Sequence, residues 1–200
     1  MVKDKEVIKR TFILILILVL TGIVVPIMGI LAPAVATDIL DLDLLEVSTR
    51  IMFPIGLGAV LGGLATVKLL KNGRKKTVIT SGLILGATSL FFLGVIVSNL
   101  PNKADFGTIA SLFLGIALAM TVIPSQTFLQ EHTPEAMRGR VFGVLSFSIT
   151  VASFLPIMSL AALTEFFGER TILTGLAFVL LFSAVISVNR RLRIKKLYAK

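Results

Sequence analysis

The stretch TFILILILVLTGIVVPIMGIL, residues 11–31, carries no charged side chain from its first residue to its last. A helix needs about 20 apolar residues to cross the roughly 30 Å hydrocarbon core of a bilayer. This stretch therefore predicts a transmembrane helix, and it decides how the rest of the chain is interpreted.

Five further stretches resemble it, and only Lys68 is charged inside them, near a helix end where its side chain can reach the membrane surface. The chain is 56% hydrophobic and 16% charged, with a mean hydropathy of +0.98, whereas soluble domains carry about 25% charged residues. We therefore predict an all-α, polytopic membrane protein. Its six transmembrane helices are expected at about 11–37, 51–70, 77–98, 108–130, 141–164 and 171–188.

The basic residues predict the orientation of these helices. An even number of spans places both termini on one side, and that side receives all but three of the 20 lysines and arginines; the exceptions are Arg50, Lys103 and Arg170. Lys and Arg concentrate on the cytoplasmic side of membranes. We therefore expect a multi-pass protein of the inner (plasma) membrane, with a cytoplasmic lead-in at 1–10, a bundle at 11–188 and a basic tail at 189–200. Because these charges alternate with spans, the net charge of +9 does not indicate nucleic-acid binding.

The first span also imitates a secretory signal peptide, because basic residues and an apolar run precede APAVA at 32–36. Signal peptides have apolar regions of about 7–15 residues. The apolar run here is longer, which favours a retained helix.

Prolines suggest an internal repeat of three plus three helices with inverted topology. Pro26 lies in the first span and Pro124 at a similar place in the fourth. Proline removes a backbone donor, and breaks at matching places in two repeats indicate a substrate path in transporters. The alternative is that proline is simply common in membrane helices. Small residues four apart, in the pairs Gly58/Gly62 and Gly82/Gly86, predict close helix packing.

Charged and metal-binding side chains are scarce in the predicted spans. No Asp, Glu, Arg or His lies deep in any of them, no cysteine is present, and His132 is the only histidine. Intramembrane ionisable groups mark proton relays and catalytic sites. We therefore expect no enzyme, no cofactor and no metal site, and we interpret His132 as an interfacial bystander.

The polar groups at membrane depth are neutral, and they gather in the fourth and fifth spans. They predict a neutral cavity suited to a lipophilic solute. The alternative is ordinary hydrogen bonding between helices, or of a hydroxyl to its own helix. The candidate cavity residues are Thr21, Pro26, Met120, Pro124, Ser125, Gln126 and Ser146.

The polar segment EHTPEAMRGR, residues 131–140, separates the fourth and fifth spans. Thr133 followed by Pro134 and Glu135 predicts an N-cap, a proline at the first helical position and an acid in the first turn. Gly139 would then permit a tight bend. Two interpretations of Arg138 and Arg140 stay open: they hold an inward gate through carboxylates or helix-end carbonyls, or they anchor the orientation.

Three segments in order, GLGAVLGGLA (56–65), KNGRKK (71–76) and PSQTFLQEHTPEAMRGRVFG (124–143), resemble the C-terminal six-helix half of a major facilitator superfamily transporter. The resemblance is greatest to the bacterial multidrug and siderophore exporters, in which a Gln, a Pro, an acid and Arg-Gly-Arg-Val follow one another. It implies a cytoplasmic gate formed by Glu135, Arg138, Gly139 and Arg140 with Arg74 and Lys75. One departure is Thr66, which stands where the family's loop signature has an acid.

Such transporters have twelve helices in two bundles of six. The resemblance therefore implies half of a secondary transporter that exports a lipophilic small molecule by alternating access. Its expected partners are the lipid bilayer and either an N-terminal six-helix half or a second copy. The alternative is a non-transporting membrane scaffold, or a truncated remnant, that binds a partner.

Overall fold

The structure is a computed structural model that describes residues 2–70 and 75–198, and every regular element in these ranges is helical. Its α-helices are α1 (Val2–Ala34), α2 (Phe53–Leu70), α3 (Lys75–Phe91), α4 (Lys103–His132) and α5 (Glu135–Tyr198). Short π and 3-10 turns lie between them at Val35–Ile39, Leu44–Glu46, Ser48–Met52, Phe92–Ile96 and Val97–Asn99.

The long helix α5 contains two spans and bends shortly after their boundary, at Gly168. This residue has φ 75° and ψ 157°, a non-helical conformation that glycine adopts without a Cβ clash. We call Glu135–Leu160 the first arm of α5 and Ala162–Val188 the second arm. With both arms counted, the described residues hold six helical stretches long and apolar enough to cross a membrane. The other four are Ile15–Ile39, Leu44–Leu70, Lys75–Asn99 and Lys103–Glu131.

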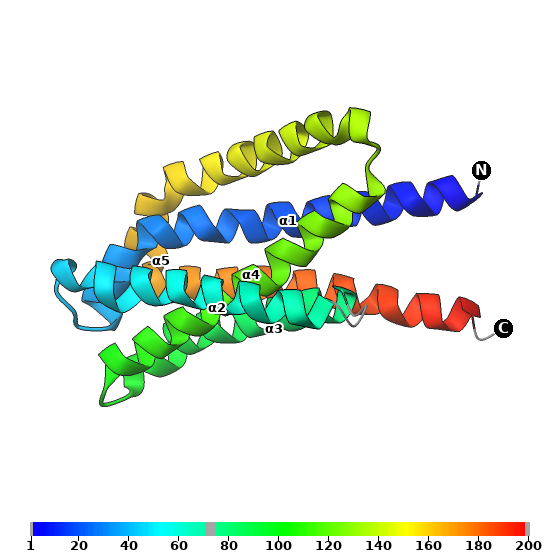
Figure 1. The fold of residues 1–200 in the computed structure, drawn as a ribbon. Coiled ribbons are helices and arrows are strands. Elements are labelled where there is room, and N and C mark those ends of the chain that lie inside the picture. The colour runs from blue at the N-terminus through cyan, green and yellow to red at the C-terminus, as the bar shows by residue number, and fades with distance from the viewer. Residues whose placement is uncertain (1, 71–74, 199–200) are drawn as a thin grey trace.

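The prediction of an all-α protein with six transmembrane helices is therefore confirmed. Figure 1 shows that successive spans run in opposite directions and that both termini lie at the same end of the bundle. We call this the terminal end, and it also holds the connection between α4 and α5; the links from α1 to α2 and from α3 to α4 lie at the distal end. The inverted repeat and the orientation in the membrane stay predictions.

Glycines bring the backbones of α2 and α4 into direct contact. A Cβ on Gly58 would lie 2.1 Å from the carbonyl oxygen of Leu112, and a Cβ on Gly115 would lie 2.0 Å from the carbonyl oxygen of Ile55. Gly62 is also confined, because its Cβ would lie 2.8 Å from the Cα of Ile116. The close packing predicted for the first glycine pair is confirmed, and α4 is the helix on which it packs.

The main hydrophobic core lies between α1, α3, α4 and the second arm. Gly82 of α3 faces α4, whereas Gly86 faces Leu180 of the second arm, so the second glycine pair also marks close packing. A hydrogen bond of 2.8 Å between the hydroxyls of Thr80 and Ser187 joins α3 to the second arm near the terminal end. The second arm is thus held along its length by α3.

The first arm packs on α1. Leu145 forms a small buried cluster with Leu18 of α1 and Leu129 of α4, which we call the terminal cluster. One turn farther along, the side chain of Ile149 lies 3.0 Å from the position of a Cβ on Gly22. Since α2 packs mainly on α4, the first arm, α1, α4 and α2 follow one another across the bundle (Figure 1).

Candidate functional site

The structure buries three of the predicted cavity residues: Thr21, Pro124 and Ser125. Thr21 is 1% exposed and Ser125 is 0% exposed. The Thr21 hydroxyl donates a hydrogen bond of 2.8 Å to the carbonyl oxygen of Ile17, the self-helix bond that was the alternative interpretation. The Ser125 hydroxyl has no hydrogen-bond partner.

The remaining cavity candidates point in different directions. Pro26 is half-buried, whereas Gln126 and Ser146 are exposed. Met120 lies against α3, because its Cβ is 3.0 Å from the position of a Cβ on Gly82. The structure therefore does not bring the seven predicted residues together around one cavity within this bundle.

A polar hollow of about 380 Å³ lies instead at the distal end, lined by both partners of two ion pairs. Lys103 contacts Asp41 at 2.6 Å, and Arg50 contacts Asp105 at 2.9 Å. These pairs tie the start of α4 to the link after α1 and to the start of the second span. A second hollow, of about 320 Å³, is almost entirely apolar and lies between α3 and α4. Neither contains a predicted site residue.

The segment 131–140 differs from its prediction in two ways. Thr133 is extended, with φ −106° and ψ 124°, but its hydroxyl donates a hydrogen bond of 2.7 Å back to the carbonyl oxygen of Leu129. It therefore ends α4 and does not cap α5. The bend predicted at Gly139 is also wrong, because α5 continues as a helix through this residue. The chain reverses at Thr133 and Pro134, and α5 begins directly after this proline, whose missing amide hydrogen costs no helical hydrogen bond.

Arg138 interacts within this connection. Its Nε donates a hydrogen bond of 3.3 Å to the carbonyl oxygen of Thr133, and its guanidinium lies 3.5 Å from the Glu135 carboxylate. It thus joins the first turn of α5 to the end of α4. The Arg140 side chain is exposed.

Lys75, at the start of α3, forms an ion pair with Glu131, in the last turn of α4. Lys75 was among the predicted gate residues and Glu131 was not, because pairing across 56 residues depends on which two helix ends are neighbours. The sequence signal for Glu131 was an acidic residue in the polar segment 131–140, which separates the fourth and fifth spans. Arg74, the other residue predicted in this loop, lies outside the described residues.

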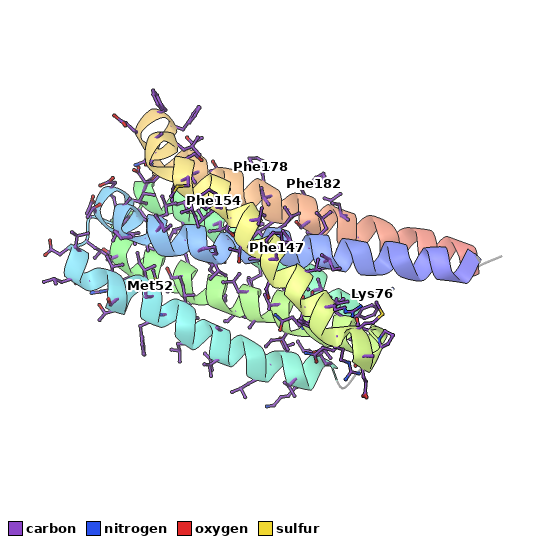
Figure 2. The ribbon with its side chains drawn as sticks, turned by 90° about the horizontal axis from the view of Figure 1, so that it is seen from above. Met52, Lys76, Phe147, Phe154, Phe178 and Phe182 are labelled. Carbon is purple, nitrogen blue, oxygen red and sulfur yellow. The ribbon has the colours of Figure 1, made fainter. Side chains whose placement is uncertain are left out.

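Long apolar stripes are exposed on the first arm and on α2. On the first arm the stripe comprises Val144, Phe147, Val151, Phe154 and Met158, each at least 54% exposed. On α2 it comprises Phe53, Leu57, Val60, Leu64 and Val67. We compare the buried share of the most apolar window in each span. It is 12% in the first arm and 22% in the second span, Leu44–Leu70, but 44% in the first and fourth spans. Figure 2 shows Phe147 and Phe154 along the first arm, and Phe178 and Phe182 along the second arm.

Exposed polar side chains lie on the first arm, which carries one of the two apolar stripes. Ser146 and Thr150 are exposed on the first arm, and Gln126 is exposed on α4. The exposed face of the second arm, by contrast, carries Phe178, Phe182 and Val185. The Thr150 hydroxyl donates a hydrogen bond of 3.0 Å to the carbonyl oxygen of Ser146. The exposed face of the first arm is thus mixed, whereas the second arm is apolar at these three positions.

Comparison with known proteins agrees with this architecture. Residues 2–157 match the model of the Major Facilitator Superfamily. The chain is 29% identical over 133 residues to the "Probable inositol transporter 2" of Arabidopsis thaliana, covering 63% of this chain and 21% of the relative. It is 26% identical over 140 residues to the "Uncharacterized MFS-type transporter YfmI" of Bacillus subtilis (strain 168), covering 70% of this chain and 34% of the relative. No solved structure matches significantly.

These matches cover about a fifth and a third of the lengths of the two relatives. They agree with a multi-pass membrane protein and point to a transporter rather than an enzyme. The family match extends over most of the chain, from α1 through most of the first arm. The chain therefore belongs to the Major Facilitator Superfamily.

Proposed function

We propose that this chain is one six-helix bundle of a secondary transporter, and that it works by alternating access against a second bundle. The observation that carries the proposal is the exposed face of the first arm. There the apolar stripe that includes Phe147 and Phe154 stands beside exposed Ser146 and Thr150. Such a mixed face fits a protein surface with a polar pathway better than it fits lipid.

The position of the stripes supports the same arrangement. The first arm and α2 flank the pair formed by α1 and α4, which are the helices that contain Pro26 and Pro124. A second bundle that covered both stripes would enclose the exposed surfaces of α1 and α4 between them. Proline-interrupted helices facing an enclosed path are the arrangement found in transporters.

The terminal end is proposed to be cytoplasmic, in the inner (plasma) membrane. Lys75, Arg138 and Arg140 lie at this end, as do both termini. Its basic residues outnumber those at the distal end, as the positive-inside rule requires. The gate then consists of the Arg138 contacts with Thr133 and Glu135.

We further propose export of a lipophilic small molecule, because the exposed surfaces of the membrane spans offer many apolar groups and no charge at their centre. The relative named a probable inositol transporter favours a second candidate, a neutral polyhydroxylated solute. Exposed Gln126, Ser146 and Thr150 could hydrogen-bond such a solute. The partner is an N-terminal bundle or a second copy of this chain.

Reconstitution into vesicles tests the proposal. The assembly would be purified through a tag on this chain, and it would be compared with the isolated chain diluted below one copy per vesicle. We expect the assembly to move a lipophilic dye or radiolabelled inositol under an imposed ion gradient, and we expect the isolated chain to be inactive. Transport by the isolated monomer would contradict the need for a second bundle. Inactivity of the intact assembly toward both solutes would favour a scaffold or remnant.

A further inference from the structure

The polar hollow and the apolar hollow lie one helical turn apart along α4. Asp105 lines the polar hollow, whereas Ile109 and Phe113 line the apolar hollow. Residues four apart lie on the same face of a helix, and all three of these side chains are exposed. The two hollows therefore adjoin the same exposed face of α4.

The charge pattern of α4 places the two hollows at different membrane depths. Residues 106–130 carry no charge, so the hydrocarbon core begins just after Asp105. A helix rises about 1.5 Å per residue, which puts Ile109 and Phe113 about 6 and 12 Å deeper than Asp105. One leaflet contributes about 15 Å of hydrocarbon. The apolar hollow thus lies at the depth of the acyl chains in the leaflet at the distal end, which we call the distal leaflet.

The two hydroxyls that line the apolar hollow are satisfied within their own helix. Thr88 and Ser89 both donate to the carbonyl oxygen of Leu85, at 2.9 and 2.8 Å. The other lining residues are apolar: Leu85, Phe92, Ile109, Ala110 and Phe113. A polar solute would lose its hydration here without compensation. This volume of about 320 Å³ therefore suits part of a hydrocarbon chain.

The polar hollow carries two positive and two negative side chains. Lys103 pairs with Asp41 and Arg50 pairs with Asp105, and all four side chains are at least 29% exposed. One hydrogen bond joins each pair, whereas a guanidinium has five N–H donors and an ammonium has three. The cations thus keep donors for a phosphate, and the carboxylates keep acceptor positions for an ammonium. This neutral set of charges complements a zwitterion better than a net anion.

We propose that the two hollows together bind one phospholipid of the distal leaflet, whose zwitterionic head group has a primary ammonium. The phosphate accepts hydrogen bonds from Arg50 and Lys103, and the ammonium donates to Asp41 and Asp105. One acyl chain passes Ile109 and enters the apolar hollow. The lipid thereby links α4 to α3 and to the start of the second span. This site goes beyond the proposed function, because it does not depend on transport.

Lipid-dependent thermal unfolding of the purified, delipidated full chain in detergent tests the site. Dioleoyl-phosphatidylethanolamine would be compared with dioleoyl-phosphatidylglycerol, which has the same acyl chains and a phosphate but no ammonium. We expect the first lipid to raise the unfolding temperature. Its half-saturating lipid fraction should be about tenfold lower than that of the second lipid, because hydrogen bonds between charged groups are lost with the ammonium.

Two variants test the head-group and acyl-chain parts separately. Arg50→Gln removes a charged donor, so it should raise the half-saturating fraction of phosphatidylethanolamine about tenfold. Thr88 is exposed and lines the apolar hollow, so Thr88→Phe places a ring where the chain would lie. It should weaken binding by at least about the same factor.

Each variant has a matched control. Arg170→Gln removes another exposed cation, which lies outside the polar hollow, and Ile84→Phe adds a ring at an exposed position of α3 outside the apolar hollow. Both controls should bind like the wild type. Equal binding of the two lipids, wild-type binding in Arg50→Gln or Thr88→Phe, or the same loss in the controls would each overturn the site. Since no transport is measured, none of these results bears on the proposed function.

Discussion

Gly58 of α2 lies directly against the backbone of Leu112 in α4, because a Cβ on Gly58 would stand 2.1 Å from the Leu112 carbonyl oxygen. Gly115 of α4 makes the reciprocal contact with the carbonyl oxygen of Ile55. Backbone atoms cannot rotate away as a long side chain can. The two helices therefore form one unit whose spacing is set by hydrogen atoms on glycine.

Adding a methyl group at this contact should separate the helices. We expect Gly58→Ala to lower the free energy of unfolding by about 1–3 kcal/mol, the usual cost of overpacking. Gly56→Ala is the control, since it lies on the same helix and a Cβ there would meet nothing within 4 Å. Unfolding of both variants in detergent gives the comparison. Equal stability of the two would show that α2 and α4 do not pack through Gly58.

The ion pair between Lys75 and Glu131 should contribute little to stability. The two side chains are 28% and 48% exposed, and exposed pairs contribute up to about 1 kcal/mol. A double-mutant cycle with Lys75→Gln and Glu131→Gln should give a coupling of that size, and added salt should reduce it. Lys68→Gln, at the exposed end of α2, should show no coupling to Glu131→Gln. A coupling above about 2 kcal/mol that resists salt would contradict this.

The two arginines of the connection between α4 and α5 should differ in their effect on transport. Arg138 bonds the Thr133 carbonyl and lies beside Glu135, whereas Arg140 is exposed. Loss of a hydrogen bond from a charged group changes an equilibrium by about tenfold or more. We expect Arg138→Ala to lower the transport rate of the intact assembly by about that factor, and Arg140→Ala to lower it less. Wild-type rates for both variants, at unchanged membrane abundance, would leave the arginines as orientation anchors.

Much of the fold follows from the sequence because lipid imposes simple rules. A span must be long and apolar, so uncharged stretches such as 11–31 indicate helices without any knowledge of their neighbours. Glycine spacing likewise predicted close packing at Gly58 and Gly62. It could not name α4 as the partner, since that choice depends on how six helices are arranged and not on either helix alone.

The candidate site was harder to predict for the same reason. Thr21, Ser125 and Gln126 are all polar residues at membrane depth, but the structure buries the first two and exposes the third. Which side of a helix faces a neighbour is not encoded in residue type. Gly139 shows a second limit, because glycine permits a bend but does not require one, and α5 continues through it.

Photocrosslinking can identify what covers the first arm. The chain contains no cysteine, so Phe154→Cys and Phe178→Cys would each carry a single benzophenone label in native membranes. Phe154 is 62% exposed on the first arm and Phe178 is 65% exposed on the second arm, which matches the two positions for accessibility. Illumination would then attach each label to whatever lies against it.

A two-bundle transporter should give a protein adduct larger than the 21.5 kDa chain from the Phe154 position, and lipid adducts from the Phe178 position. A second epitope tag on coexpressed chain would distinguish another copy from a different bundle. Lipid adducts alone from both positions would contradict the claim that this chain is one half of a two-bundle transporter.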